Sequence, residues 1–253
     1  MKPLAILSLI VLLSNSWAHD FGTLIFEDSF ERVESQELKD EPGNEWTTSS
    51  DKTAKGYKEV DLRDGHMYIY THAKANHATS VRHAFKFKDG TLGLRFKLED
   101  KDDILTLNFA DMDLKTVWAG HLFKVTIGTN DVKVTDQKTG EMNLKLRNAR
   151  KEGTITEHQK ALISQKNATF PNKLKTRQWH QVYTTIKGDE LTITIDSNDI
   201  SNITYVYQRS FFTIQIASTR GKNCNCPICK LIFIIPYFYV FTNNCRFPRM
   251  RKT

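Results

Sequence analysis

Hydrophobic and polar residues alternate along much of the chain between residues 19 and 220, which is the period of a β-strand with one buried face. The run from Ser80 to Lys88 places valine, histidine and two phenylalanines on one face and mostly basic residues on the other. Thr91–Glu99 repeats the alternation, and Asp89-Gly90 between the two runs is a favoured two-residue turn. The two runs therefore predict a β-hairpin.

Further runs follow the same rule and are separated by turn residues such as Lys187–Glu190. These runs are His66–Tyr70, Ile104–Ala110, His121–Ile127, Val132–Asp136, Trp179–Lys187, Leu191–Asp196 and the candidate closing strand Ser210–Ile216. From Thr156 onward the spacing is helical instead, with Thr154 or Thr156 as the cap and Phe170-Pro171 as the end. Many strands with one inserted helix predict an all-β sandwich rather than an α/β sheet.

The two ends of the chain differ from this body. Residues 1–18 contain Lys2, the apolar stretch Leu4–Leu13 interrupted only by Ser8, and small residues before Ala18. This pattern predicts a signal peptide cut after Ala18 and a secreted or periplasmic protein. Residues 221–253 contain no acid, all four cysteines and an aromatic, apolar run. We therefore expect one domain over 19–220, followed by an altered tail that need not belong to the fold.

The net positive charge of the chain comes from its two ends. The formal net charge is +7, of which the first 18 residues supply one and residues 221–253 supply six. The 29 acidic residues all lie in the body, where an equal number of basic residues balances them. Such a body lacks the positive field that binds phosphate backbones, so we expect no nucleic-acid partner. No apolar run reaches the length of a membrane span, so none is expected in the mature chain.

Short motifs are spread over residues 24–198. They are Phe26–Arg32, Gly43–Thr48, Asp61–His66, Ala119–Leu122, Thr139-Gly140, Gln178–Val182, Lys187–Asp189 and Ile193–Asp196. Together they resemble concanavalin A-like jelly-roll domains, above all the exported bacterial 3-keto-disaccharide hydrolase-like, or glycoside-hydrolase-like, proteins. The last block, a Trp-His strand, a turn and a strand ending in aspartate, resembles a laminin-G-like signature. The resemblance implies a concanavalin A-like jelly-roll sandwich, a fold that serves lectins, enzymes and adhesion modules alike.

Catalytic carboxylates are not evident in the sequence. Retaining glycosidases of this fold often carry Glu-x-Asp-x-x-Glu on one strand, because the reaction needs two carboxyl groups on either side of the glycosidic bond. The nearest match, Glu59–Asp64, ends in aspartate and directly precedes Gly65, so we interpret it as a turn before a strand. The catalytic residues, if the protein is an enzyme, stay unknown.

Two groups of residues, an acidic loop and the four cysteines, are candidates for metal binding. The acidic loop with Asp100, Asp102 and Asp103 has the hard oxygens that calcium prefers, but no ligand set follows from it. The cysteines Cys224, Cys226, Cys229 and Cys245 lack the paired spacing of a zinc knuckle. We therefore expect no metal or other cofactor, with calcium as the open alternative.

A sugar cleft uses exposed aromatic rings flanked by polar side chains. Trp118 and His121 follow a loop that begins at Asp111, and Arg82 and His83 lie on the predicted strand Ser80–Lys88. These five residues are the candidate carbohydrate-binding site. For the two histidines the structural alternative is a ring at the core or rim of the sandwich, bonded to a backbone group.

The function that follows is an exported carbohydrate-binding protein without catalysis, whose partner is a polysaccharide or glycoconjugate. The alternative is a glycosidase or polysaccharide lyase on a similar substrate, with a histidine as general base in the lyase. A third class is a structural or adhesion module of the cell surface. The sequence is compatible with a binding protein and with an enzyme.

Overall fold

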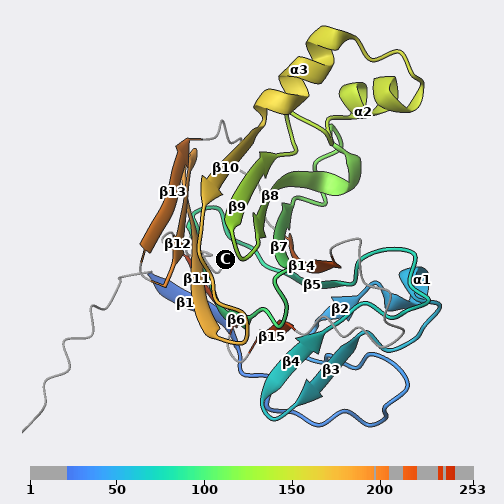
Figure 1. Ribbon diagram of the computed structural model, residues 1–253, viewed down its shortest axis with the longest axis vertical. Coiled ribbons are helices and arrows are strands. Elements are labelled where there is room, and N and C mark those ends of the chain that lie inside the picture. The colour runs from blue at the N-terminus through green and yellow to red at the C-terminus, as the bar shows by residue number, and fades with distance from the viewer. Residues whose placement is uncertain (1–21, 197, 205–212, 221–232, 236–237, 243–253) are drawn as a thin grey trace, which may run out of the picture.

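The computed structural model describes residues 22–196, 198–204, 213–220, 233–235 and 238–242. These residues form an all-β jelly-roll sandwich in which two antiparallel sheets pack face to face (Figure 1). The predicted signal peptide and all four cysteines lie outside the described residues. Within the described part of the chain, no helix has the length and apolar character needed to cross a membrane.

The first sheet has six strands in the order β1-β16-β6-β11-β12-β13. Its strands are β1 (Thr23–Asp28), β16 (Phe238–Thr242), β6 (Gly90–Lys97), β11 (Trp179–Lys187), β12 (Glu190–Ile195) and β13 (Asn198–Thr204). β11 and β12 pair from Lys187 and Glu190 onward. The turn predicted at these residues is therefore confirmed.

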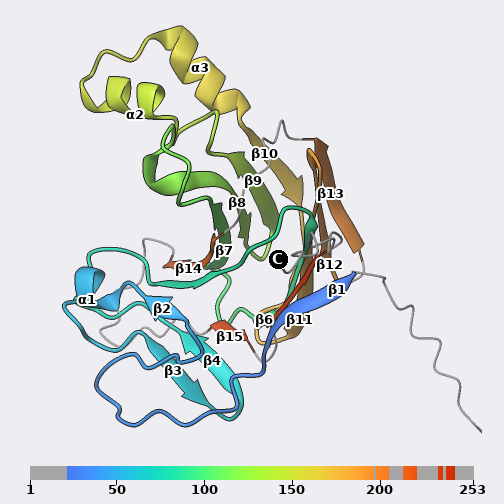
Figure 2. The same cartoon turned by 180° about the vertical axis from the view of Figure 1, so that it is seen from behind.

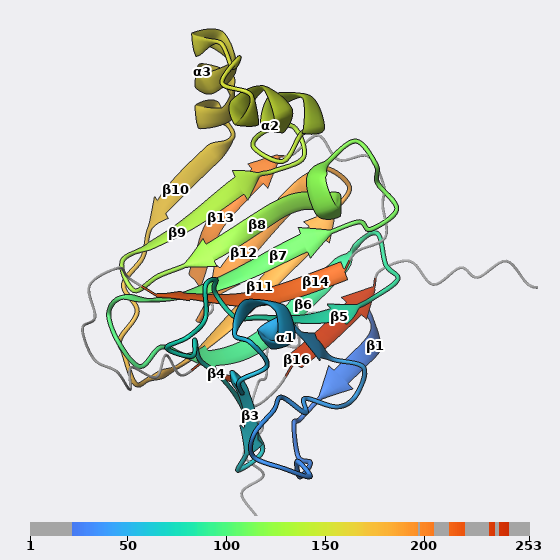
Figure 3. The same ribbon diagram turned by 90° about the vertical axis from the view of Figure 1, so that its right-hand side faces the viewer.

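The second sheet has seven strands in the order β10-β9-β8-β7-β14-β5-β2. Its strands are β10 (Asn167–Pro171), β9 (Asp131–Asp136), β8 (His121–Ile127), β7 (Asp103–Ala110), β14 (Thr213–Arg220), β5 (Ser80–Ala84) and β2 (Thr47–Thr48). Figure 3 views the molecule with this sheet in front of the six-stranded one. A small third sheet consists of β15 (Phe233–Ile235), β4 (His66–Ile69) and β3 (Val60–Arg63). Figure 2 shows β3 and β4 at one end of the sandwich.

The core lies between the two large sheets and is built by the alternating residues. From β6 come Leu92, Leu94 and Phe96, and from β7 come Leu105, Leu107 and Phe109, all essentially inaccessible to solvent. Each apolar side chain of this size contributes about 1.5–3 kcal/mol when it is fully buried. The residues between them face outward, so each sheet has an outer surface on which polar side chains can gather.

The hairpin predicted across Asp89-Gly90 is wrong. β5 pairs with β14 and β2, whereas β6 pairs with β11 and β16, so the two strands belong to different sheets. Phe85 and Phe87 between them are buried in the core. The chain thus crosses from one sheet to the other here, and both strands turn their apolar face toward the same interior.

The inserted segment contains two helices rather than one. α2 (Leu144–Lys151) begins where the Asn143 side chain accepts hydrogen bonds from two backbone amides. α3 (Glu157–Gln165) is capped by Thr156, one of the two threonines that the sequence offers as the cap, and Thr156 forms a capping box with Gln159. α3 ends before Phe170-Pro171, which belongs to β10 instead. Both helices extend from one end of the seven-stranded sheet (Figure 3). The remaining helices of the described residues are the four-residue α1 (Ser50–Thr53) and the 3-10 turn η1 (Trp118–Gly120).

Part of the expected tail is built into the sandwich. β16 lies between β1 and β6, and its Val240 is fully buried. β15 pairs with β4 in the small sheet. The structure therefore differs at these residues from a tail outside the fold. The physical reason is that β1 and β6 each expose an edge that an apolar strand can fill with backbone hydrogen bonds.

The motifs at Phe26–Arg32 and Gly43–Thr48 share one anchor, the buried carboxylate of Asp28. It accepts hydrogen bonds from the Phe30 amide, Arg32, the Asn44 amide group and the Trp46 indole at 2.7–3.1 Å. Burial acts to raise the pKa of Asp28, but these donors outweigh it and hold the pKa below its usual value. The first loop of the domain is thereby fixed against the sheet edge.

Candidate functional site

A cleft of about 720 Å³ crosses the outer face of the seven-stranded sheet, the sheet nearest the viewer in Figure 3. Its described lining is polar and basic with a few small or methionine side chains. The lining residues are His77, Ala78, Arg82, Thr106, Asn108, Ala110, Met112, Ala119, His121, Lys124, Thr126, Lys133, Gln137 and Met142.

Strand register sets the order of the basic side chains along this cleft. Arg82 on β5 lies opposite Gln215 on β14, which lies opposite Asn108 on β7, which lies opposite Lys124 on β8. Lys133 follows on β9, opposite Thr126 of β8. From Arg82 to Lys133 the cleft therefore spans four strand spacings, or about 19 Å. That is the length of an extended ligand rather than of a single small ion.

His121 and Asn108 form the polar centre of the cleft. The His121 Nδ1 lies 3.0 Å from the Asn108 Nδ2 and 3.2 Å from its Oδ1, so the two side chains are hydrogen-bonded in either amide orientation. Burial lowers the pKa of His121, and the nearby charges of Lys124 and Arg82 lower it further while Glu141 opposes them. The imidazole is therefore neutral at pH 7, in a locally positive field.

The positive side chains of the cleft are only partly neutralised. Lys124 forms an ion pair with Glu141 at 2.9 Å. Neither Arg82 nor Lys133 makes an ion pair within the described part of the chain. The Arg82 guanidinium donates to the Ser80 hydroxyl at 2.9 Å, and its buried Nε has no hydrogen-bond partner among the described residues.

Carboxylates are absent from the described lining of the cleft. The sequence of β14, which crosses the middle of the sheet, also contains no acidic residue. Glu141 is the acid bonded to lining residues, through Lys124 and Gln137. Burial acts to raise the pKa of Glu141, but those two partners and Arg150 lower it overall. Glu141 is therefore an ionised partner of Lys124 at neutral pH.

Of the five candidate residues from the sequence, the structure brings Arg82 and His121 together in the cleft. It does not bring His83 there. His83 is 5% exposed and packs against Phe26, Trp46 and Phe85 between the sheets, with Nδ1 3.0 Å from the Ala84 carbonyl. Adjacent residues of a strand face opposite sides of the sheet, so Arg82 and His83 cannot share one surface.

Trp118 and Asp111 lie at one end of the cleft, next to lining residues. Trp118 is 47% exposed, and the Arg147 guanidinium of α2 lies 3.7 Å from its ring centroid, so one ring face is already covered. The Asp111 carboxylate accepts the Asp113 amide of its own loop at 2.9 Å. Neither side chain lines the cleft itself.

Sequence reasoning missed Asn108, Lys124 and Lys133. Each occupies an outward position between buried residues of its strand, as Asn108 does between Leu107 and Phe109. The alternation alone marks these positions as outward. It could not show that their strands are neighbours in one sheet, which is what gathers the three side chains.

The Glu59–Asp64 match to a catalytic motif lies away from the cleft, on β3 of the small sheet. Glu59 is fully buried there, and Asp61 pairs with Lys58 at 2.8 Å and with Arg63 at 3.3 Å. Its acids therefore do not face a common open space of the kind that a glycosidic bond requires.

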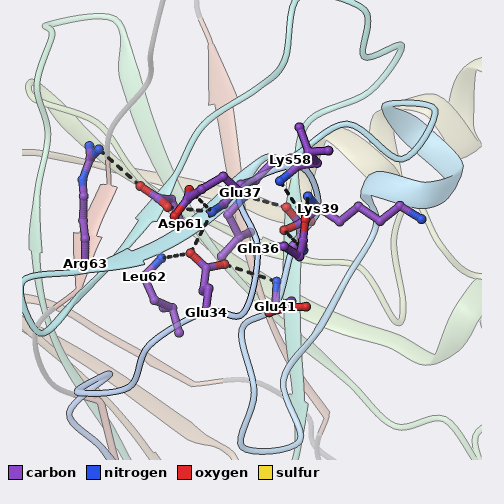
Figure 4. Close-up of polar contacts among 12 residues, drawn as sticks. Glu34, Gln36, Glu37, Lys39, Glu41, Lys58, Asp61, Leu62 and Arg63 are labelled. Atoms are coloured by element: carbon purple, nitrogen blue, oxygen red, sulfur yellow. Dashed lines mark hydrogen bonds and ion pairs between the residues drawn. The ribbon is translucent and has the colours of Figure 1, made fainter.

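An acidic cluster surrounds Lys58 (Figure 4). Carboxylate oxygens of Glu34, Glu37 and Asp61 lie within 4.8 Å of one another, a spacing that a metal ion could use. The Lys58 ammonium already lies among them, 2.8 Å from Glu34, 3.0 Å from Glu37 and 2.8 Å from Asp61. Burial acts to lower the pKa of Lys58, but the three carboxylates raise it well above its usual value. The cluster is thus a structural ion network centred on the lysine.

The loop considered for calcium uses its buried acid internally. The Asp103 Oδ2 accepts the backbone amides of Glu99 and Asp100 at 2.9 and 2.8 Å. Burial raises the pKa of Asp103 to about 6, and the neighbouring acids Asp100 and Glu99 add to this effect. The carboxylate therefore closes the turn before β7.

No family model matches the chain, and no curated protein matches it by sequence. Solved structures with the same fold do match. SCLam, a non-specific endo-β-1,3(4)-glucanase of family GH16, is 11% identical with a TM-score of 0.59, over 94% of this chain and 93% of that one. The laminarinase of Flavobacterium sp. UMI-01 is 13% identical with a TM-score of 0.58, over 87% of this chain and 100% of its own. An endo-β-galactosidase of Clostridium perfringens that releases GlcNAcα1-4Gal is 11% identical with a TM-score of 0.60, over 87% of this chain and 62% of its own. These matches show the fold expected from the sequence, the jelly roll of glycoside hydrolases.

Proposed function

We propose that the protein is an exported carbohydrate-binding β-sandwich that holds a polysaccharide or glycoconjugate without cleaving it. The observation that carries this proposal is the cleft of about 720 Å³ across the seven-stranded sheet, with its polar lining and no carboxylate among the described lining residues. Its length of about 19 Å suits several sugar units. The N-terminal pattern of residues 1–18 supports export.

The same lining argues against a glycosidase. Hydrolysis by the usual route needs two carboxyl groups about 5–9.5 Å apart, one of them protonated to assist the leaving group. Glu141 is bonded to the cleft lining, and its lowered pKa leaves it ionised at neutral pH. A single ionised carboxylate paired with Lys124 provides neither the proton donor nor the second acid.

A polysaccharide lyase is the second candidate, and His121 favours it. Lyases remove a proton next to a carboxylate group, which needs an unprotonated base within the cleft. The lowered pKa of His121 keeps its ring neutral at pH 7, and it lies beside Asn108. Arg82 lies on the same sheet face. These groups supply a base and donors, while a proton donor for the leaving oxygen is not evident among the described lining residues.

The test is saccharide binding by the purified mature chain on a glycan array, followed by assays of product release on each ligand found. New reducing ends would report hydrolysis, and absorbance of an unsaturated product would report elimination. We expect binding with neither product. Turnover would replace this proposal with one of the two enzymes, and a failure to bind any saccharide would leave the adhesion module.

Two matched variants locate the binding surface. Thr106→Trp places a large ring on the cleft floor, and Thr192→Trp makes the same change at a half-buried position of β12 on the opposite sheet. We expect loss of saccharide binding in the first variant and retention in the second. Equal binding by both variants would place the site elsewhere.

A further inference from the structure

The basic side chains of the cleft indicate a more specific ligand than a saccharide in general. Arg82, Lys124 and Lys133 come from three strands, β5, β8 and β9, and line one open surface. The body that carries them has no net charge. Their gathering is therefore a property of the fold rather than of an overall basic composition.

Their bonding leaves these charges available. Lys133 is exposed and, within the described residues, makes no ion pair. Among the described residues, the side chain of Arg82 bonds to the Ser80 hydroxyl and makes no ion pair. An arginine side chain presents five donors in a fixed fork that matches an oxyanion group, so the Arg82 guanidinium in the lining of the cleft suits such a group. Glu141 neutralises one of the three charges, Lys124, and leaves the other two.

The spacing of the charges indicates an extended ligand with repeated negative groups. Arg82 and Lys133 lie four strand spacings apart, about 19 Å, with Asn108, His121 and Lys124 between them. One small anion cannot bridge that distance. A chain of sugars that carries a negative group at intervals can contact both ends and hydrogen-bond to the centre.

We propose that the cleft binds an acidic polysaccharide, whose carboxylate or sulfate groups pair with Arg82 and Lys133 while its hydroxyl groups bond to Asn108. This inference rests on the proposed carbohydrate function and names the ligand class of the same site. The shared chemistry is a sugar chain bearing oxyanions, and the test separates the two sources of the charge.

The experiment measures the affinity of the full mature chain for three polymers at 150 mM salt. Polygalacturonate carries carboxylates, dextran sulfate carries sulfate esters, and laminarin is neutral. We expect at least one acidic polymer to bind tenfold or more tightly than laminarin, and its affinity to fall as added salt screens the charges. The stronger of the two acidic polymers identifies the oxyanion.

Three variants distinguish binding in the cleft from nonspecific attraction by other basic residues, including those of residues 221–253. Lys133→Met should weaken binding of the acidic polymer about threefold, as expected for one exposed charge pair. Arg82→Met should weaken it about tenfold or more, because a hydrogen bond to a charged group is lost with the charge. The control Lys187→Met removes an equal charge from an exposed position on the opposite sheet and should leave binding unchanged. The melting temperature of each variant confirms that it is folded.

The outcomes are distinct. If laminarin binds as tightly as both acidic polymers, the acidic-ligand inference is overturned while the proposed carbohydrate function stands. If Lys187→Met weakens binding as much as Arg82→Met, the attraction is nonspecific and the inference is also overturned. If no polysaccharide binds, the proposed function itself fails together with the inference.

Discussion

The buried carboxylate of Asp103 makes the stability of this protein depend on pH in a predictable direction. Its side chain is 4% exposed and its pKa is raised to about 6 by burial and by two neighbouring acids, against an ordinary value of 3.8. The change to test is Asp103→Asn. The asparagine oxygen can still accept the amides of Glu99 and Asp100, so the turn keeps its bonds while the charge is removed.

The magnitude follows from proton linkage. Between pH 3.8 and about 6 the folded chain holds a proton on Asp103 that the unfolded chain has lost, so the free energy of unfolding falls as the pH rises. Each pKa unit corresponds to about 1.4 kcal/mol, so the full loss is about 3 kcal/mol by pH 7. The Asp103→Asn variant has no carboxyl group at this position and does not lose this stability as the pH rises. Relative to wild type, the variant should therefore gain up to about 3 kcal/mol in stability between pH 4 and pH 7.

The assay is urea unfolding of both proteins, followed by circular dichroism at pH 4, 5, 6 and 7. Asp102→Asn is the control, because it removes the same charge from an exposed residue of the same loop. Its difference from wild type should change little with pH. If the difference between wild type and Asp103→Asn is also constant from pH 4 to pH 7, Asp103 does not hold a buried proton and the reasoning is refuted.

Three further changes test the framework of the fold by chemical denaturation. Val240→Asp puts a charge at the fully buried centre of β16 and should lower the free energy of unfolding by at least about 3 kcal/mol. Val33→Asp, at a residue that is 97% exposed, should leave it almost unchanged. Equal effects of the two changes would mean that β16 does not occupy the sheet. Lys58→Met leaves Glu34 without its cation and Asp61 with Arg63 alone, and it should cost about 3–5 kcal/mol at pH 7, part of it recovered at pH 4. Lys160→Met, in an exposed pair, should cost under about 1 kcal/mol. A Lys58→Met cost that is independent of pH would contradict the ion network. Asp28→Asn weakens the anchor of Arg32 and Trp46 and should lower the free energy of unfolding by about 3 kcal/mol at pH 7. Because the pKa of Asp28 is lowered in the fold, this difference should shrink as acid protonates the wild-type side chain. A difference that persists unchanged in acid would refute the role of the charge.

The candidate site shows where sequence reasoning stops. The sequence predicts Trp118 and His121 as site residues that follow one loop, and the structure places His121 in the cleft but Trp118 beside Arg147 at its end. The sequence also predicts both Arg82 and His83 as site residues, but a strand turns adjacent residues to opposite faces. Lys124 and Lys133 carried no local signal, because a lone lysine on an outward face is ordinary.

By itself, the sequence determined which residues face inward and outward in most strands, the turn between β11 and β12, and the start of α3 at a threonine cap, Thr154 or Thr156. These features depend on neighbours a few residues apart, through side-chain alternation and local hydrogen bonds. Only the tertiary structure decided that β5 and β6 belong to different sheets, that β16 fills the gap between β1 and β6, and that Arg82 and Lys133 share a cleft. In a two-sheet sandwich both sheets turn apolar residues toward one core, so alternation cannot tell which sheet a strand joins. Pairing between distant segments decides that, and with it which outward side chains meet.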